Sequence, residues 1–170
     1  MMDYSSLIRD IPDYPEPGIV FKDITPLCNN PEALISCAKE LADRFRDTDI
    51  DRVVGAEARG FIFGPLIAVE LKAGFVPVRK PGKLPSKTIS ESYELEYGTD
   101  TLEMHEDAIA EGEKVLIVDD LLATGGTVCA ILKMIRRLKG VPAGVAALIE
   151  LSFLNPADKI DVPIEALIKY

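Results

Sequence analysis

The chain has 170 residues, 48% of them hydrophobic and 28% charged, which is typical of one globular domain with a sizeable core. Its net charge of −9 disfavours broad binding to nucleic acid, although a locally basic site remains compatible with a small anionic ligand. No apolar run approaches the ~18 residues of a membrane span and no secretory signal is visible, so we expect a cytoplasmic protein without a membrane partner.

The N-terminal part of the chain predicts little regular structure before a well-marked helix. Residues 1–29 are rich in Pro and Asp, and we expect irregular structure there with a short helix near residues 4–10. Asn30 before Pro31 is typical of a helix start, because Asn caps free N–H groups and Pro fits the first helical position. Apolar side chains then recur at helical spacing, which predicts a helix over residues 31–46.

The rest of the chain alternates short apolar runs with helical patterns. The apolar runs predict strands at residues 52–56, 75–79, 114–118, 145–149 and 164–168. Helical spacing predicts helices over residues 60–72 and 127–138, which end near Gly74 and Gly140. This alternation predicts an α/β fold, with a central, mostly parallel sheet flanked by helices, in a single domain over residues 1–170. Ligands of such folds bind beyond the C-terminal ends of the strands.

Residues 80–100 stand out as a long segment with little periodicity. Pro81, Gly82 and Pro85 interrupt it, and only a short hairpin arm is expected, at residues 93–97. A loop of this length inside a domain is typical of a functional lid.

The cysteine and histidine content argues against a zinc site. Cys28, Cys37 and Cys129 are widely spaced, no C-x-x-C pair occurs, and His105 is the only histidine. We expect three reduced and mostly buried thiols.

The stretch VLIVDDLLATGGT, residues 115–127, combines two carboxylates with a turn suited to an anion. Asp119 and Asp120 follow the most apolar predicted strand, and residues 124–127 precede the next helix. Free N–H groups at a helix start bind phosphate, and glycines let it approach the backbone closely. Neither the P-loop pattern nor the dinucleotide-binding glycine pattern occurs.

Chemistry alone leaves several roles open for this stretch. The turn is either a phosphate site or a plain structural turn. The aspartates are suited to bind Mg²⁺ directly, to accept hydrogen bonds from neighbouring sugar hydroxyls, or to face solvent at a strand end. A ribose 5-phosphate would offer a diol to the carboxylates and a phosphate to the turn.

The thirteen residues of this stretch resemble the phosphoribosyl-pyrophosphate (PRPP) motif of the type I phosphoribosyltransferases. Four further segments resemble the adenine phosphoribosyltransferase family, in its order: PEPGIVFKDITP (15–26), GAEARGFIFG (55–64), VPVRKPGKLP (76–85) and YELEYG (93–98). The resemblance implies the type I phosphoribosyltransferase fold, with a small N-terminal hood over residues 1–30 and a flexible catalytic loop over residues 80–100. Ala58 departs from the Ser of many relatives, and we expect little effect because the following Arg59 is kept.

The resemblance also implies an activity and a set of anion-binding residues. The activity is transfer of the phosphoribosyl group of PRPP to adenine, which yields AMP and pyrophosphate, with Mg²⁺ held mainly through PRPP, pyrophosphate and water rather than directly by the protein. The 5′-phosphate would be bound by Ala123, Thr124, Gly125, Gly126 and Thr127. The ribose would be bound by Asp119 and Asp120, and the pyrophosphate by Arg59, Arg79, Lys80 and Lys83.

The base and the catalytic loop are assigned in the same way. Adenine would be bound by Val20, Phe21 and Lys22, with Phe21 stacked on the purine. The catalytic residues would be Arg59 and Glu96, with Glu96 handling a proton on the purine ring, and Tyr97 would help to close the loop. A homodimer is implied, with Arg59 near its interface. We expect residues 80–98 to be mobile without ligand and ordered with PRPP.

Three other functions are alternatives to transfer of the phosphoribosyl group to adenine. The same scaffold serves other bases, namely hypoxanthine, guanine, xanthine and orotate, but PGIVFKDITP and LEYG favour adenine. A PRPP-binding regulator is disfavoured by the acidic charge and by the intact Glu96. A Mg²⁺-dependent phosphohydrolase using Asp119 leaves the TGGT turn and the RKPGK segment unexplained.

Overall fold

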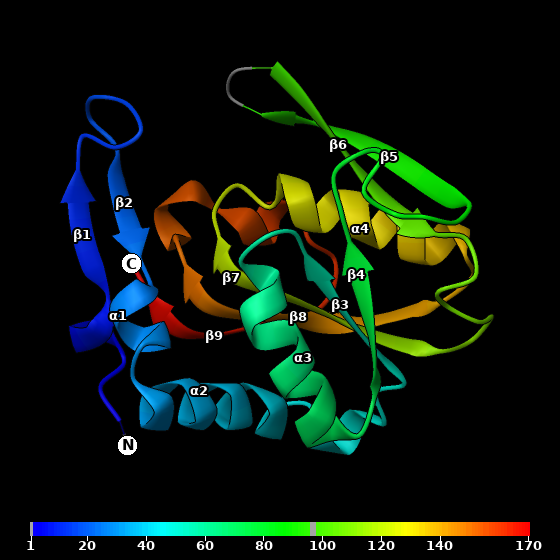
Figure 1. Cartoon of the computed structure of the whole chain (residues 1–170), viewed down its shortest axis with the longest axis horizontal. Helices are drawn as coiled ribbons and strands as arrows, with labels where there is room; N and C mark the ends of the chain where they lie inside the picture. Colours follow the sequence, from blue (N-terminus) through cyan, green and yellow to red (C-terminus); the bar gives the residue numbers. More distant parts are fainter. Residues whose placement is uncertain (1, 96–97) are drawn as a thin grey trace.

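The centre of the molecule is a parallel sheet with the strand order β4-β3-β7-β8-β9 (Figure 1). The computed structural model describes residues 2–95 and 98–170. The sheet is formed by β3 (Arg52–Ala56), β4 (Gly74–Val78), β7 (Lys114–Leu122), β8 (Val141–Glu150) and β9 (Ile164–Lys169). The predicted α/β fold and central parallel sheet are confirmed, and β7 extends four residues beyond its predicted end at residue 118.

Helices cover both faces of the sheet, and each face has its own apolar cluster. The helices α2 (Pro31–Asp43) and α3 (Gly60–Leu71) pack on one face, and α4 (Gly126–Arg137) packs on the other. Along β7, Leu116 and Val118 belong to the first cluster, whereas Val115 and Ile117 belong to the second. A strand buried on both sides needs the continuous apolar run that identified it in the sequence.

The ends of two helices differ from the prediction, while the predicted start of α2 is confirmed. Asn30 caps α2 by accepting a hydrogen bond from the Ala33 N–H at 3.1 Å. The helix ends at Asp43, three residues early, because a 3₁₀ turn follows that buries Phe45. The helix α3 ends at Leu71 and is capped by Lys72 in the left-handed conformation, so the predicted cap at Gly74 is wrong; Gly74 begins β4.

The expected N-terminal helix is replaced by an antiparallel hairpin. Only a 3₁₀ turn (Ser5–Leu7) forms there, and β1 (Arg9–Pro12) pairs with β2 (Val20–Asp23), followed by α1 (Thr25–Cys28). The strand forms because residues 9–12 pair with partners 8 to 14 positions further along the chain, which no local pattern reveals. From here on we use the name hood for this hairpin alone, residues 9–23 of the expected 1–30, and it stands at one end of the sheet (Figure 1).

The segment expected to be a flexible loop is mostly a second antiparallel hairpin. The strands β5 (Thr88–Leu95) and β6 (Gly98–His105) pair along their whole length, and we call them the arm. Ile89, Leu102 and Met104 are buried where the arm packs over α4. The arm is therefore longer than the predicted residues 93–97, and the irregular part shrinks to residues 79–87.

The remaining connections are short. The other 3₁₀ turns lie at Arg46–Thr48, Ser152–Leu154 and Pro156–Asp158.

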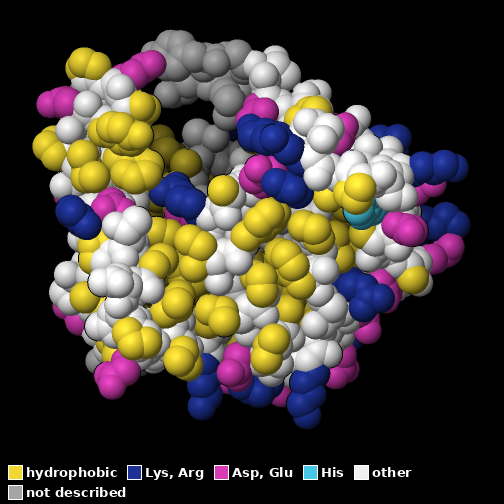
Figure 2. All heavy atoms as spheres, viewed as in Figure 1, with side chains coloured by type: hydrophobic (Ala, Val, Ile, Leu, Met, Phe, Trp, Pro, Cys, Tyr) yellow, Lys and Arg dark blue, Asp and Glu magenta, His cyan; other side chains and the backbone are white. Residues whose placement is uncertain are grey.

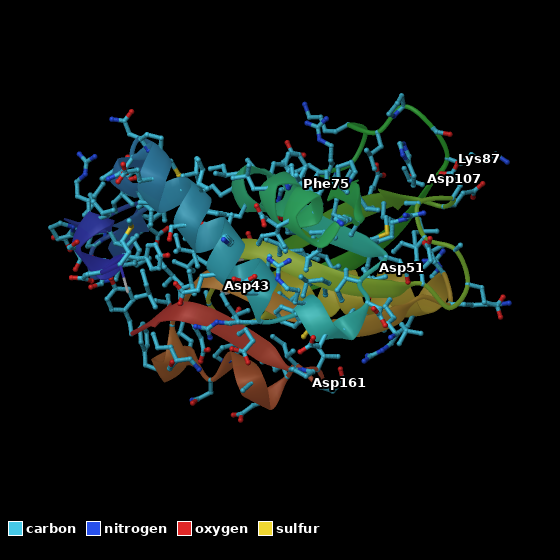
Figure 3. All side chains as sticks on the ribbon, turned by 90° about the horizontal axis from the view of Figure 1, so that it is seen from below. Asp43, Asp51, Phe75, Lys87, Asp107 and Asp161 are labelled. Carbon is cyan, nitrogen blue, oxygen red and sulfur yellow. The ribbon has the colours of Figure 1, made fainter. Side chains whose placement is uncertain are left out.

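On β4, Phe75 lies beside α3 (Figure 3), with its ring edge-on to Phe61 at a centroid distance of 5.9 Å. Within residues 2–95 and 98–170, no helix has both the length and the apolar character needed to cross a membrane.

Candidate active site

The site lies at the C-terminal end of β3, beside the C-terminal part of β7, residues 119–122. Gly55 of β3 pairs with Val118 of β7. Residues 57–59, which follow β3, therefore lie close to Asp119 on β7. A Cβ at Gly60 would lie 3.0 Å from the Val118 carbonyl oxygen and 3.3 Å from Asp119 Oδ1. Glycine at this position therefore lets the start of α3 lie directly against the two carboxylates.

Asp119 and Asp120 form a tightly packed acidic pair. Asp119 Oδ1 accepts a hydrogen bond from the Asp120 backbone N–H at 2.9 Å. Arg59 Nε lies 3.0 Å from Asp120 Oδ2, an ion pair whose angle does not suit a hydrogen bond. That buried oxygen consequently has no hydrogen-bond donor among the described residues, although Asp120 is only 3% exposed.

Burial perturbs the titration of both carboxyl groups. Burial, followed by the neighbouring charge of Asp120, raises the pKa of Asp119 well above its ordinary value of 3.8. Burial also raises the pKa of Asp120, and the Arg59 guanidinium limits that rise. Carboxyl groups with such raised pKa values are typical of ligand sites, because the surrounding protein does not fully compensate their negative charge.

A cavity of about 220 Å³ opens in front of this pair. Arg59 and Lys80 line it together with both aspartates, so two of the four predicted pyrophosphate ligands face the predicted ribose ligands. Glu57 and Ala58, joined by a cis peptide bond, form part of the same wall.

A second cavity of about 140 Å³ is formed by the turn before α4. Its wall includes Asp119 and the whole predicted phosphate-binding turn: Ala123, Thr124, Gly125, Gly126 and Thr127. Gly125 has φ +81° and directly precedes the first residue of α4, so the turn presents free N–H groups at the positive end of a helix of 12 residues. The two cavities share Asp119 and Thr127, which places an anion-binding turn next to the acidic pair.

Tyr93 connects the arm to this site and was not among the predicted residues. Its hydroxyl accepts a hydrogen bond from Thr127 Oγ1 at 3.3 Å and donates one to Asp100 Oδ2 at 3.2 Å. Lys80 Nζ pairs with the same Asp100 carboxylate, and burial raises the pKa of Tyr93. Sequence reasoning could have found Tyr93, since it opens the YELEYG segment, but nothing local indicated that its hydroxyl reaches Thr127.

The other two predicted pyrophosphate ligands do not face either cavity. Arg79 holds Glu57 through Nε to Oε2 at 3.1 Å and Nη2 to Oε1 at 3.3 Å, and this lowers the pKa of Glu57. Lys83 is exposed, and its carbonyl accepts a hydrogen bond from Arg79 Nη1. In this conformation Arg79 and Lys83 thus support the wall behind Glu57 rather than the cavity itself.

The predicted adenine-binding residues lie on β2, at the edge of the hood. The Arg59 guanidinium carbon is 5.0 Å from the centroid of the Phe21 ring, and Tyr14 stands edge-on to that ring at 5.2 Å. Arg59 therefore lies between Phe21 and Asp120. Figure 2 shows a hollow beside the hood, with hydrophobic side chains on the hood side and charged side chains across from them. Glu96 and Tyr97 lie outside the described residues.

The donor set fits a metal ion that arrives with a substrate. Among residues 2–95 and 98–170, no group of three or more His, Cys, Asp or Glu side chains is placed to hold a metal ion. Mg²⁺ is commonly bound through one or two carboxylates, waters and substrate phosphates. The acidic pair, with its one unsatisfied oxygen, is compatible with that arrangement.

Comparison with known proteins identifies the family. Residues 24–162 match the family model described as the phosphoribosyl transferase domain. The adenine phosphoribosyltransferase of Kosmotoga olearia is 55% identical over 159 residues, which cover 94% of each chain.

Solved structures agree with that match. Adenine phosphoribosyltransferase from Thermoanaerobacter pseudethanolicus superposes with a TM-score of 0.95 at 49% identity, over 98% of both chains. The Saccharomyces cerevisiae enzyme, solved with adenine and an imino-altritol bisphosphate, gives a TM-score of 0.90 at 39% identity over 96% of both chains. The chain belongs to the phosphoribosyltransferase family and, within it, to the adenine phosphoribosyltransferases.

Proposed function

We propose that this chain transfers the 5-phosphoribosyl group of PRPP to adenine, which yields AMP and pyrophosphate in purine salvage. The observation that carries the proposal is the pair of adjoining cavities, one with the acidic pair and two cations and the other with a glycine turn at a helix start. A ligand with a diol, a phosphate and a pyrophosphate has a group for each of these features.

The phosphate-binding turn is proposed to hold the 5′-phosphate of PRPP. Backbone N–H groups of residues 123–127 and the hydroxyls of Thr124 and Thr127 supply the donors, and the dipole of α4 favours the negative charge. Thr127 would donate its hydroxyl proton to the phosphate, and the Tyr93 hydroxyl would then donate to Thr127 Oγ1 and keep it oriented.

The acidic pair is proposed to hold the ribose hydroxyls. Carboxylates accept hydrogen bonds from two neighbouring hydroxyls without any change in protonation. Arg59 and Lys80 line the same cavity and would neutralise the pyrophosphate. Arg79 and Lys83 are proposed to join them only if the segment over residues 79–87 rearranges, because Arg79 now holds Glu57.

The hood is proposed to hold adenine between Phe21 and the sugar. The Phe21 ring offers an apolar face to the purine, and the backbones of Val20 and Lys22 would read its edge. Arg59 lies against the same ring, so the base and the leaving group would meet at this residue.

The reaction breaks the C1′–O bond to pyrophosphate and forms a C1′–N9 bond to adenine. Pyrophosphate leaves with the electron pair, so positive character develops on C1′ and negative charge on the leaving group. Arg59 and Lys80 are in place before the reaction, which makes their stabilisation of that charge effective. Glu96 is proposed to take part in removing the N9 proton. Bound Mg²⁺, held through PRPP, pyrophosphate and water, would share the charge of the pyrophosphate.

The arm is proposed to exclude water from the activated sugar. It already contacts the site through Tyr93, while Ile89, Leu102 and Met104 anchor its base in the core. Amide hydrogen exchange should therefore slow over residues 90–98 when Mg²⁺ and PRPP are added, and should change little at the buried base. Unchanged exchange over residues 90–98 would contradict a closing arm.

A homodimer and a cytoplasmic location complete the proposal. Apart from Glu70 the helix α3 is apolar, Val69 on it is 76% exposed, and hydrophobic side chains gather over α3 and β4 on the face seen in Figure 2. Such a face favours an interface, with Arg59 at the start of the same helix close to it. Cys28, Cys37 and Cys129 are all unpaired, and burial raises the pKa of Cys37 to about 12; free thiols fit a reducing compartment.

The decisive experiment compares AMP formation from adenine with product formation from hypoxanthine, guanine, xanthine and orotate. We expect turnover with adenine to exceed the others by at least about 100-fold, since a site that reads polar edges rejects wrong ones strongly. Equal rates with hypoxanthine would overturn the specificity, and no turnover with any base would favour a PRPP-binding regulator.

Two substitutions assign the roles within that reaction. Arg59→Ala should weaken PRPP binding, whereas Glu96→Ala should lower kcat and leave PRPP binding largely intact. Lys87→Ala is the matched control, because Lys87 is exposed and lines neither cavity.

A further inference from the structure

Tyr170, which follows β9, covers a residue of the hood. Lys22 Nζ lies 3.8 Å from the centroid of the Tyr170 ring, and Figure 1 shows this end of the chain beside β2. Tyr170 is itself firmly placed, because its N–H donates to the Glu150 carbonyl at 3.0 Å and its carbonyl accepts from the Ser152 N–H at 2.8 Å. The ring therefore extends from the central sheet to the hood.

Lys22 has two side-chain partners, Asp10 and Tyr170, and of these only Tyr170 connects it to the central sheet. Its Nζ pairs with Asp10 Oδ1 at 2.7 Å, but Asp10 is the cross-strand neighbour of Lys22 inside the hairpin. The Lys22 side chain is 12% exposed and that of Asp10 58%, so the ammonium group lies in the more sheltered position. A cation against an aromatic face gains most when it is shielded from water, so the Tyr170 contact is well placed to hold Lys22.

The position of Lys22 decides the position of its neighbours on β2. Phe21 lies next to Lys22 in the strand and contacts Arg59 at the acidic pair. The hood thus meets the rest of the molecule at two consecutive side chains, Phe21 over Arg59 and Lys22 under Tyr170. Any loosening at Lys22 would change how Phe21 and Val20 face the site.

We propose that Tyr170 is a positioning residue for the adenine end of the site, acting through its cation–π contact with Lys22. The inference rests on the proposed function, because it takes β2 as the strand that binds adenine. PRPP would be held by β7, the start of α4, Arg59 and Lys80, none of which takes part in the contact between Lys22 and Tyr170. Tyr170 is therefore expected to affect adenine and to leave PRPP unaffected.

The test separates the aromatic ring from the rest of the side chain. Tyr170→Leu removes the ring and should raise KM for adenine about three- to tenfold, with KM for PRPP within about twofold of the unsubstituted protein. Tyr170→Phe keeps the ring and should restore the original KM for adenine. Phe153→Leu, an exposed aromatic residue in the turn after β8, is the matched control and should change neither constant.

A double-substitution cycle tests whether Lys22 transmits the effect. Lys22→Met keeps an apolar side chain and removes the charge, so Tyr170→Leu should add less than about twofold in that background. Should Tyr170→Leu not fold, Tyr170→Met replaces it, since methionine also lacks a ring. Thermal unfolding of each variant identifies such a failure.

The outcomes that overturn the proposal differ from those that overturn the proposed function. An unchanged KM for adenine in Tyr170→Leu, equal increases in both KM values, or a Tyr170→Phe variant as impaired as Tyr170→Leu would each refute the positioning role. Absence of adenine-dependent turnover in the unsubstituted protein would instead refute the proposed function.

Discussion

At the residue scale, the half-buried Asp119 and the buried Asp120 are the strongest sign that this site binds a ligand. Burial and mutual repulsion raise the pKa of Asp119, so the folded state favours its protonated form more than the unfolded state does. Stability from this group is present below the ordinary value of 3.8 and is lost as pH rises through the raised pKa. At neutral pH, well above the ordinary value of 3.8, Asp119 consequently lowers the stability of the ligand-free protein relative to low pH.

Replacing Asp119 by asparagine should therefore raise the stability of the protein and also lower its activity. We expect the melting temperature of Asp119→Asn at pH 7 to rise by about 2–4 °C, the shift that ~1 kcal/mol produces in a chain of this size. The gain should vanish near pH 3.5, and kcat/KM for PRPP should fall at least about tenfold. Asp107→Asn, at an exposed carboxylate, is the control, and an equal gain there would refute the explanation.

Tyr93 makes a second prediction at this scale, because its hydroxyl links the arm to the phosphate-binding turn. Tyr93→Phe keeps the ring against the core and removes only the hydroxyl. KM for PRPP should rise about two- to tenfold, as for one lost hydrogen bond, while the melting temperature changes by less than about 2 °C.

The control for Tyr93 lies next to it on the same strand. Ser92 makes its hydrogen bond within the arm, to Thr101 at 2.8 Å, so Ser92→Ala should not affect PRPP. If both variants raised KM equally, the effect would belong to the arm as a whole rather than to the Tyr93 hydroxyl.

At the scale of elements, the turn between β7 and α4 depends on one left-handed glycine. Gly125 has φ +81°, and a Cβ there would also lie 3.2 Å from Ile160 Cδ1. Gly112 has a similar φ of +84° in a remote turn, with nothing within 4 Å of a Cβ. At both positions the left-handed backbone would strain any residue other than glycine. Only Gly125 belongs to the phosphate-binding turn.

Substitution of each glycine by alanine separates strain from function. Both variants should lose about 1–2 kcal/mol of stability, since an alanine in the left-handed region costs about that much, and Gly125→Ala should lose somewhat more because its Cβ also meets Ile160. Only Gly125→Ala should raise KM for PRPP, by about tenfold or more, because it alone alters the N–H groups of the turn. Equal KM values for the two variants would argue against a phosphate at residues 124–127.

At the scale of the whole molecule, the proposed homodimer would cover the apolar outer face of α3. We expect sedimentation equilibrium to give twice the chain mass of 18.6 kDa. Val69→Asp should shift the protein towards monomer, because it places a charge on this face. Ile35→Asp, at an exposed aliphatic residue of α2, should leave the mass unchanged, and a monomeric parent protein would refute the interface.

The sequence by itself determined those features whose parts are close together in the chain. The apolar run of β7, the aspartates at its end and the glycine turn before α4 lie within thirteen residues, so their chemistry is readable before any folding. The Asn30 cap and the alternation of strands and helices are local in the same way, which is why the fold class, the sheet and most helix positions were predicted correctly.

Only the tertiary structure decided the features that depend on distant partners. The hood became a hairpin, the arm reached residues 88–105, Arg79 turned to Glu57, and Tyr93 met Thr127 across 34 positions. Lys22 and Tyr170 are separated by nearly the whole chain, yet their contact ties the hood to the sheet. Local propensity cannot reveal such pairings, because their free energy comes from surfaces that meet only after the chain has folded.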